Sequence, residues 1–152
     1  MHSVYLVGVD HRIQYTNSSC GHEWRADIQA FEDYLVYKAN ELEVELLAEE
    51  FNQEGVERNN ATGCTVRDAA KRSSKRHLFC EATMYEKQSQ GIDTPDKREH
   101  IWLSKLKDSE TESILLVCGD SHLSSFSEKL NAEGVRTEIL SNGWGHDWMY
   151  KQ

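Results

Sequence analysis

The sequence predicts one α/β domain, in which helices cover both faces of a mainly parallel sheet of about five strands. Short apolar runs with the length of buried strands recur along the 152 residues, and amphipathic stretches with helical spacing separate them. The runs are continuously apolar, as expected for strands that are buried on both faces of a sheet. We therefore expect a single three-layer domain over residues 1–152.

The first third of the chain is predicted to contain a strand, a loop, a helix and a second strand. Residues 4–7 form an apolar run with β-branched side chains, and the polar segment 11–21 is expected to be a loop. Apolar side chains at helical spacing predict an amphipathic helix over residues 23–40. Another apolar run predicts the second strand over residues 44–48.

The middle of the chain is predicted to contain turns, a helix and a strand. Residues 52–64 are rich in glycine and asparagine, which favour turns. Thr65, with Asp68 three residues later, resembles the start of a helix that runs to about Ser73. A short apolar run then predicts the third strand over residues 77–80.

A polar segment over residues 83–94 is predicted to be a flexible flap, and it is the obvious candidate for a lid over a site. Thr94 and Pro95 then open a helix, because proline is well suited to the first turn. This helix carries apolar side chains to the core and is expected to end near Lys107.

The last third of the chain is predicted to contain a strand over residues 114–118, a helix over 124–133 and a strand over 135–140. Gly134 closes the helix. Residues 141–152 form a tail rich in glycine and aromatic side chains. We expect this tail either to pack on the core of its own domain or to form a homodimer contact, where aromatic residues are enriched.

One short phrase occurs twice, near opposite ends of the chain. In each copy an apolar run is followed by glycine, two further residues and histidine, first at Gly8 and His11 and then at Gly119 and His122. Glycine allows the backbone to turn tightly after a strand. The carboxyl ends of parallel strands are where open α/β sheets bind ligands. We therefore expect the two histidines to face one crevice.

Carboxylates are predicted at the same edge of the sheet. Imidazole and carboxylate groups together suit zinc, manganese, cobalt or iron, and such a metal would lower the pKa of a bound water to give a hydroxide nucleophile. The predicted metal ligands are His11, Glu50 and His122, with Glu49 as the alternative to Glu50. The further acids at this edge are Asp10, Glu81 and Asp120.

Two alternatives to a metal-dependent enzyme remain open. One histidine, held by a carboxylate, would act as a general base without a metal. The crevice would otherwise bind a small molecule or haem without catalysis, whereas nucleotide regulation is disfavoured because the usual glycine-rich phosphate loop is missing. Arg12 and Arg67 are expected near the crevice edge, where they would hold an anionic substrate.

The order of these motifs resembles the TraB/Tiki and EreA/ChaN-like superfamily. The best match is in the last third, over residues 98–102 and 114–123, followed by Phe126, Leu130 and Gly134. Residues 7–11 resemble the opening motif of this superfamily, and residues 47–50 resemble its second-strand glutamate. The resemblance covers most of the chain, but only these short segments are specific.

This superfamily includes metal-dependent proteases, macrolide esterases and a haem-binding lipoprotein. The resemblance implies a catalytic site of His11, His122 and Glu49 or Glu50, in which Arg98 binds an anion or stabilises a developing negative charge. No proline follows the first Gly-x-x-His, and the chain is much shorter than the esterases, so that peptidase or macrolide esterase activity is disfavoured. We expect a small hydrolase that acts on a small molecule or a peptide.

Composition limits the partners and the compartment. The formal net charge of −9 argues against a general affinity for nucleic acid or anionic lipid, and the basic run at residues 71–76 is expected on the edge opposite the crevice. No apolar run reaches the roughly 18 residues of a membrane span, and no signal peptide is expected. The four cysteines form no Cys-x-x-Cys pair, which predicts reduced thiols and a cytoplasmic protein.

Overall fold

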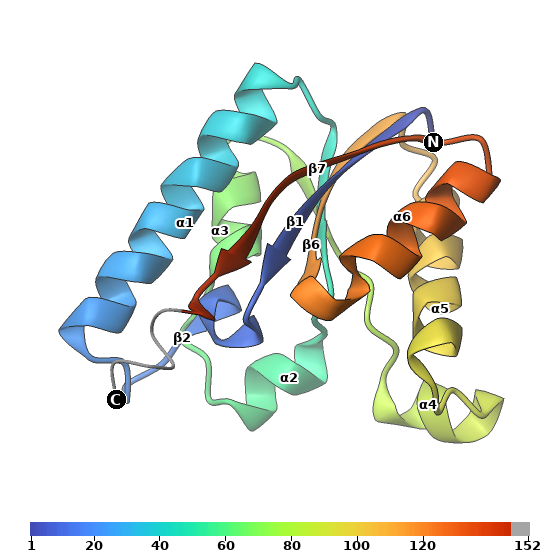
Figure 1. Cartoon of the computed structure of the whole chain (residues 1–152). Coiled ribbons are helices and arrows are strands. Elements are labelled where there is room, and N and C mark those ends of the chain that lie inside the picture. Colours follow the sequence, from blue (N-terminus) through green and yellow to red (C-terminus); the bar gives the residue numbers. More distant parts are fainter. Residues whose placement is uncertain (147–152) are drawn as a thin grey trace.

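A computed structural model, which describes residues 1–146, contains a five-stranded sheet with helices on both faces (Figure 1). The strand order is β5-β3-β6-β1-β7, and every neighbouring pair is parallel. The predicted three-layer α/β fold is therefore confirmed. The strands are β1 (Ser3–Val9), β3 (Leu46–Glu49), β5 (Arg76–Phe79), β6 (Ser113–Gly119) and β7 (Arg136–Trp144).

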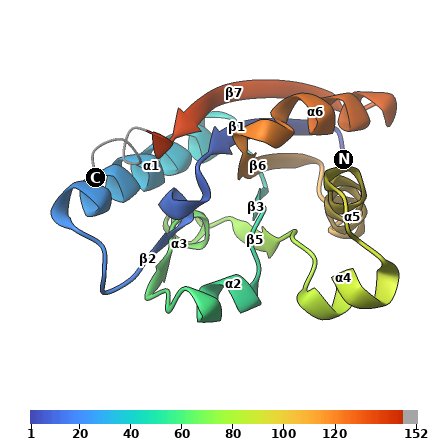
Figure 2. The same cartoon turned by 60° about the horizontal axis from the view of Figure 1, so that its bottom comes forward.

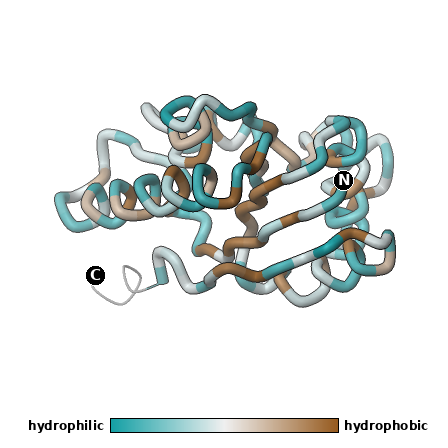
Figure 3. The backbone as a smooth tube through the Cα atoms, turned by 90° about the horizontal axis from the view of Figure 1, so that it is seen from above, coloured by the Kyte–Doolittle hydropathy of each residue, from teal (hydrophilic) through white to brown (hydrophobic). Residues whose placement is uncertain are grey.

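Four helices make the two outer layers, two on each face of the sheet (Figure 1). Helices α1 (His22–Glu41) and α3 (Thr65–Arg72) bury side chains such as Phe31 against one face, and α5 (Pro95–Asp108) and α6 (Leu123–Ala132) bury Trp102 against the other. The strands form the hydrophobic centre of the molecule, as Figure 3 shows. Each expected helix is present because its apolar stripe has a sheet face to cover.

Two segments that were predicted as loops contain short elements. Residues 11–21 include a 3-10 helix, η1 (His11–Gln14), and a short strand, β2 (Tyr15–Thr16). Residues 52–64 include α2 (Gln53–Arg58) and β4 (Gly63–Cys64), and β4 pairs with β2 in an antiparallel ribbon. Asn52 caps α2 by accepting a hydrogen bond from the backbone N–H of Gly55 at 2.8 Å.

The flap prediction was wrong, because the segment 83–94 contains a capped helix, α4 (Met84–Gln90). The Thr83 side chain accepts from the backbone N–H of Glu86, and the Glu86 carboxylate accepts from the backbone N–H of Thr83. Gly91 ends the helix in a left-handed conformation. This reciprocal capping box was present in the sequence as Thr-x-x-Glu, but the polar composition of the segment concealed it.

The aromatic tail begins later than predicted, because β7 continues to Trp144. The Trp144 ring lies 5.1 Å from Phe31 and 4.8 Å from Tyr34 between ring centres, so it packs on the core of its own domain. Trp148 and Tyr150 belong to the same predicted tail, which was expected to pack on the core or form a homodimer contact, and they lie outside the described residues.

The chain leaves β1 and β6 toward opposite faces of the sheet. These strands are neighbours with Val9 beside Gly119, and η1 and α1 follow β1 onto one face while α6 follows β6 onto the other. In open α/β sheets such a reversal creates a crevice at the carboxyl ends of the strands. The two Gly-x-x-His phrases therefore meet at the edge where open α/β sheets bind ligands.

Candidate functional site

A cleft of about 480 Å³ lies at the carboxyl edge of the sheet. Figure 2 shows α2 (Gln53–Arg58) and α4 (Met84–Gln90) on the same side of the molecule, and they contribute Arg58 and Lys87 to the lining of this cleft. The side chains that were predicted here and that line the cleft are His11, Arg12, Glu50, Glu81, Arg98 and His122. The topology therefore brings together residues that are separated by more than a hundred positions in the chain.

Glu50 is the centre of this group. Its side chain is 3% exposed, and its Oε2 lies 3.4 Å from Nε2 of His11 and 3.7 Å from Nε2 of His122. The backbone N–H of Gly119 donates to its other oxygen at 2.9 Å. Burial by itself raises the pKa of the Glu50 carboxyl, but the His11 and Gly119 hydrogen bonds outweigh burial and hold that pKa below its usual value.

Arg98 links the two buried carboxylates of the cleft. Its Nη2 donates to Oε2 of both Glu50 and Glu81, and its Nε donates to Glu81 at 3.1 Å. Burial would lower the pKa of the Arg98 guanidinium, but both carboxylates raise it, so that this cation stays charged. Arg98 is thus a fixed positive charge in the lining of the cleft.

His11 is held at both ring nitrogens. Its Nδ1 lies 2.7 Å from Oε1 of Gln14, and the amide nitrogen of the same Gln14 donates to Glu49 at 2.9 Å. Because the Glu49 carboxylate only accepts, the Gln14 oxygen must face His11, and Nδ1 of His11 therefore carries a proton. Burial lowers the pKa of His11, but the hydrogen bond and charge of Glu50 prevail and raise it to about 9.

His122 is held differently, by a buried acid. Its Nδ1 donates to Oε2 of Glu99 at 2.7 Å, and its ring packs edge-on against Trp102 with the ring centres 4.7 Å apart. Glu99 also accepts from Ser125 at 2.7 Å and from Lys129 at 3.0 Å. Burial raises the pKa of the Glu99 carboxyl. The hydrogen bonds from these donors, chiefly His122, outweigh burial and hold that pKa below its usual value.

Each glycine of the repeated phrase lies against the other copy of the phrase. A Cβ on Gly8 would lie 2.2 Å from Oδ1 of Asp120, and a Cβ on Gly119 would lie 3.0 Å from Nε2 of His11. Neither glycine has a positive φ. The expected tight turn is therefore not the reason for glycine here, and close packing between β1 and β6 is.

The sequence did not distinguish between Glu49 and Glu50 as the carboxylate of the site, but their side chains point in different directions in the structure. Glu50 lines the cleft, whereas Glu49 does not line it and is fully buried, with Gln14 at 2.9 Å and His77 at 2.5 Å from its oxygens. Adjacent residues at a strand end point to opposite faces, which explains the separation. Gln14 connects Glu49 to His11, which lines the cleft.

Of the remaining acidic and basic residues predicted at this edge, Arg12 lines the cleft, whereas Asp10, Asp120 and Arg67 do not. Asp10 caps η1 and pairs with Arg12, which lines the cleft, and Asp120 accepts from the backbone N–H of Gly143. Arg67 is not a lining residue, because it contacts the Cys64 sulfur and lies over the ring of Phe79.

The predicted metal ligands do not form a metal-binding geometry in this structure. Within residues 1–146, no group of three or more His, Cys, Asp or Glu side chains is arranged to hold a metal ion. The reason is Arg98, whose guanidinium is bonded to Oε2 of Glu50, the same oxygen that both imidazoles face. Arg98 and the two imidazoles thus share one carboxylate oxygen, and the metal remains a prediction.

Sequence reasoning gave no role to Glu99, Gln14, Arg58 or Lys87. Glu99 left a signal, because it precedes Trp102, Leu103 and Leu106 at helical spacing and is therefore an acid on an apolar helix stripe. The other residues left none, since Gln14 lies in a short 3-10 helix and the two cations lie in helices that were predicted as a turn-rich segment and a flap.

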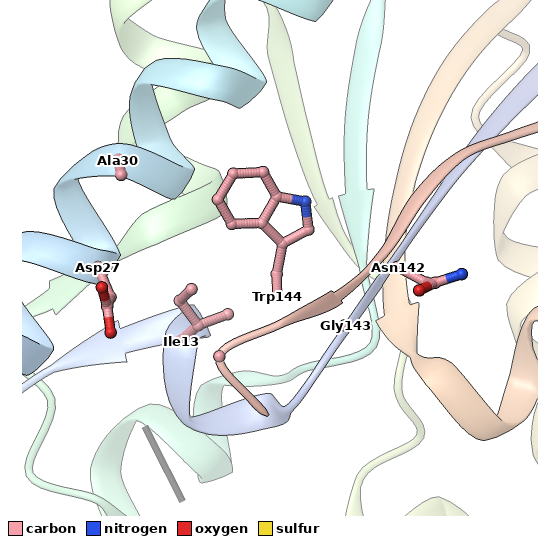
Figure 4. A pocket seen from close by; sticks show the side chains of 7 residues that line it. Ile13, Asp27, Ala30, Asn142, Gly143 and Trp144 are labelled. Carbon is pink, nitrogen blue, oxygen red and sulfur yellow. The ribbon is translucent and has the colours of Figure 1, made fainter. Parts of the chain in front are cut away.

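A second hollow, of about 200 Å³, lies between η1, α1 and the end of β7 (Figure 4). Ile13, Asp27 and Trp144 line it. It contains none of the histidines or arginines of the cleft, so we do not assign it a function.

Comparisons with family models, with curated proteins and with solved structures found no match to this chain. The resemblance to the TraB/Tiki and EreA/ChaN-like superfamily therefore stays a prediction.

Proposed function

We propose that this protein is a small hydrolase that activates water with a histidine at the carboxyl edge of its sheet. One observation carries the proposal. Two imidazoles from remote parts of the chain approach a single buried carboxylate, Glu50, within a cleft that also holds a fixed guanidinium. Such convergence of acid and base groups is typical of catalytic sites.

His122 is the general base in this proposal. Its Nδ1 proton is held by Glu99, so in the neutral ring Nε2 is free to accept a proton from a water molecule in the cleft. The oxygen of that water forms the bond to the scissile carbonyl carbon, and its proton passes to Nε2. Glu99 stabilises the imidazolium that results.

His11 is the general acid. Its pKa of about 9 means that it is protonated near neutral pH, so that it can donate a proton to the leaving oxygen or nitrogen as the scissile bond breaks. Arg98 and the protonated His11 together place positive charge where negative charge develops on the substrate. Glu50 holds both groups in position.

Two measurements distinguish the proposed hydrolase from a metal-dependent enzyme and from a non-catalytic binding protein. Metal content is measured on protein that was prepared without a chelating tag. Hydrolysis is then assayed on ester, peptide and phosphate substrates with and without a chelator. We expect activity that survives chelation. Loss of activity that manganese, zinc or cobalt restores would support the metal prediction, and the absence of turnover on every substrate would favour a binder of a small molecule or haem.

Substitution of the histidines tests the assignment of roles. We expect His122→Asn and His11→Asn each to lower kcat by roughly 10²–10⁴-fold, the usual contribution of general acid–base catalysis. His100→Asn is the matched control, because His100 is an exposed histidine on α5 that pairs with Asp96. Full activity in His122→Asn would rule out the proposed base.

The location of the protein is a proposal of the same kind. In the described residues no helix has the length and apolar character needed to cross a membrane. Cys20, Cys64, Cys80 and Cys118 are all buried and unpaired. Because free thiols persist in reducing compartments, we propose that the protein is cytoplasmic.

A further inference from the structure

The rim of the cleft is rich in cations that the proposed mechanism does not use. Arg12 comes from η1, Arg58 from α2 and Lys87 from α4, and all of them line the cleft. These elements are separate in the sequence, so their basic residues meet only in the folded chain. None of them belongs to the basic run at residues 71–76, which lies at the other edge of the sheet.

The positive charge exceeds the acids that face it. Of the described residues that line the cleft, the acids are Glu50 and Glu81, and Arg98 bonds to both. Lys87 is 3.9 Å from Glu81, whereas Arg58 is exposed. Arg12 pairs with Asp10 outside the lining. Arg12, Arg58, Lys87 and Arg98 therefore outnumber the two lining acids, and the cleft is cationic in a chain whose net charge is −9.

A local positive region on an acidic protein attracts anions and repels cations. Arginine and lysine form charge-assisted hydrogen bonds with carboxylate and phosphate oxygens, and these bonds are stronger than neutral ones. One wall of the cleft is aromatic, because Tyr15 and Phe51 stack with their ring centres 6.0 Å apart. The cleft thus offers an apolar surface beside several cationic donors.

We propose that the substrate of this cleft is anionic, with a carboxylate or phosphate group that binds Arg12, Arg58 and Lys87 while the scissile bond lies between His11 and His122. This substrate class rests on the proposed hydrolase function. The anionic group is a recognition element, separate from the reacting bond between the two histidines.

A pair of esters of equal length tests the proposal. The para-nitrophenyl monoester of glutaric acid carries a remote carboxylate, and para-nitrophenyl pentanoate is its neutral counterpart. We expect the wild-type protein to show a kcat/KM at least about tenfold higher for the anionic ester, the effect of a hydrogen bond to a charged group. We expect Arg58→Gln and Lys87→Gln each to lower this ratio several-fold, and added salt to lower it as well.

The matched controls remove the same charges elsewhere. Arg136→Gln acts at the amino end of β7, and Lys71→Gln acts at the far end of α3. Both side chains are exposed, and neither lines the cleft. If these control variants lower the ratio as much as the cleft variants do, the preference reflects net charge, and the proposed anion site is wrong.

Binding of inorganic phosphate and of glutarate, measured by calorimetry, separates this proposal from the proposed function. Turnover of both esters with equal kcat/KM, together with no binding of either anion, would reject the anion site and leave the hydrolase standing. Binding that Arg58→Gln weakens about tenfold, without turnover of any ester, would support the anion site and reject the hydrolase. Phosphate bound more tightly than glutarate would identify a phosphate-bearing ligand.

Discussion

His11 and His122 end the same sequence phrase, but they lie in different environments. The His11 side chain is 51% exposed and its Nδ1 is held by a neutral amide, whereas the His122 side chain is 8% exposed and its Nδ1 is held by a carboxylate. Both Nε2 atoms face Glu50. The difference shows that partners from other elements, rather than the phrase itself, give each histidine its proposed role.

The largest expected effect comes from the acid behind His122. Glu99→Gln keeps an acceptor for Nδ1 but removes the negative charge that stabilises the imidazolium, so we expect kcat to fall by roughly 10²–10⁴-fold. Ser125→Ala is the control, because Ser125 donates to the same Glu99 oxygen without contacting the cleft. A Glu99→Gln protein with wild-type kcat would remove the functional difference between the two histidines.

The glycines of the two phrases offer a second comparison, in which stability and activity separate. Gly8→Ala places a methyl group 2.6 Å from Cδ1 of Leu123 as well as against Asp120, so we expect a loss of about 1–3 kcal/mol in the free energy of unfolding. In Gly119→Ala the new methyl group would lie 3.0 Å from Nε2 of His11, and the His11 side chain can shift toward solvent. For Gly119→Ala we expect little loss of stability but a kcat lower by roughly tenfold.

Urea denaturation and steady-state kinetics on the two alanine variants check this pair. Equal losses of stability would show that the two strand ends are packed alike, contrary to the contacts described above. A Gly119→Ala protein with unchanged kcat would mean that a small shift of His11 does not matter for the reaction.

The smallest expected effect is the pH dependence of His11. Its pKa of about 9 in the folded chain is above the ordinary 6.5, because Glu50 favours the charged ring. The stabilisation is therefore complete below about pH 6.5 and is lost as the pH rises through 9. Because the His11 ring is half-exposed, this stabilisation is small. As the pH rises from about 6.5 to 9, we expect the free energy of unfolding of the wild-type protein to fall by less than about 1 kcal/mol relative to that of His11→Gln.

Nuclear magnetic resonance titration gives the direct measurement. The His11 ring signals should titrate with a midpoint near 9 in the wild-type protein, and this midpoint should fall in Glu50→Gln. A midpoint near 6.5 in both proteins would show that Glu50 does not hold the His11 ring in solution.

Much of the fold was predictable, and the errors have a common origin. Apolar runs and helical stripes predicted the strands and the four large helices, because burial on the sheet requires these patterns. The short helices α2 and α4 were missed, because their polar sequences bury little and depend on caps such as Asn52 and Thr83. These missed helices carry Arg58 and Lys87.

The sequence by itself determined which chemical groups stand at the strand ends, namely the two histidines and the glutamates. Only the tertiary structure decided which glutamate enters the cleft, because a one-residue difference in position reverses the face of a strand. It also decided that Glu99 holds His122 and that Arg98 binds Glu50. Such pairs join α5 to η2 and to the residue that follows β3, and local sequence preferences carry no information about contacts between remote elements.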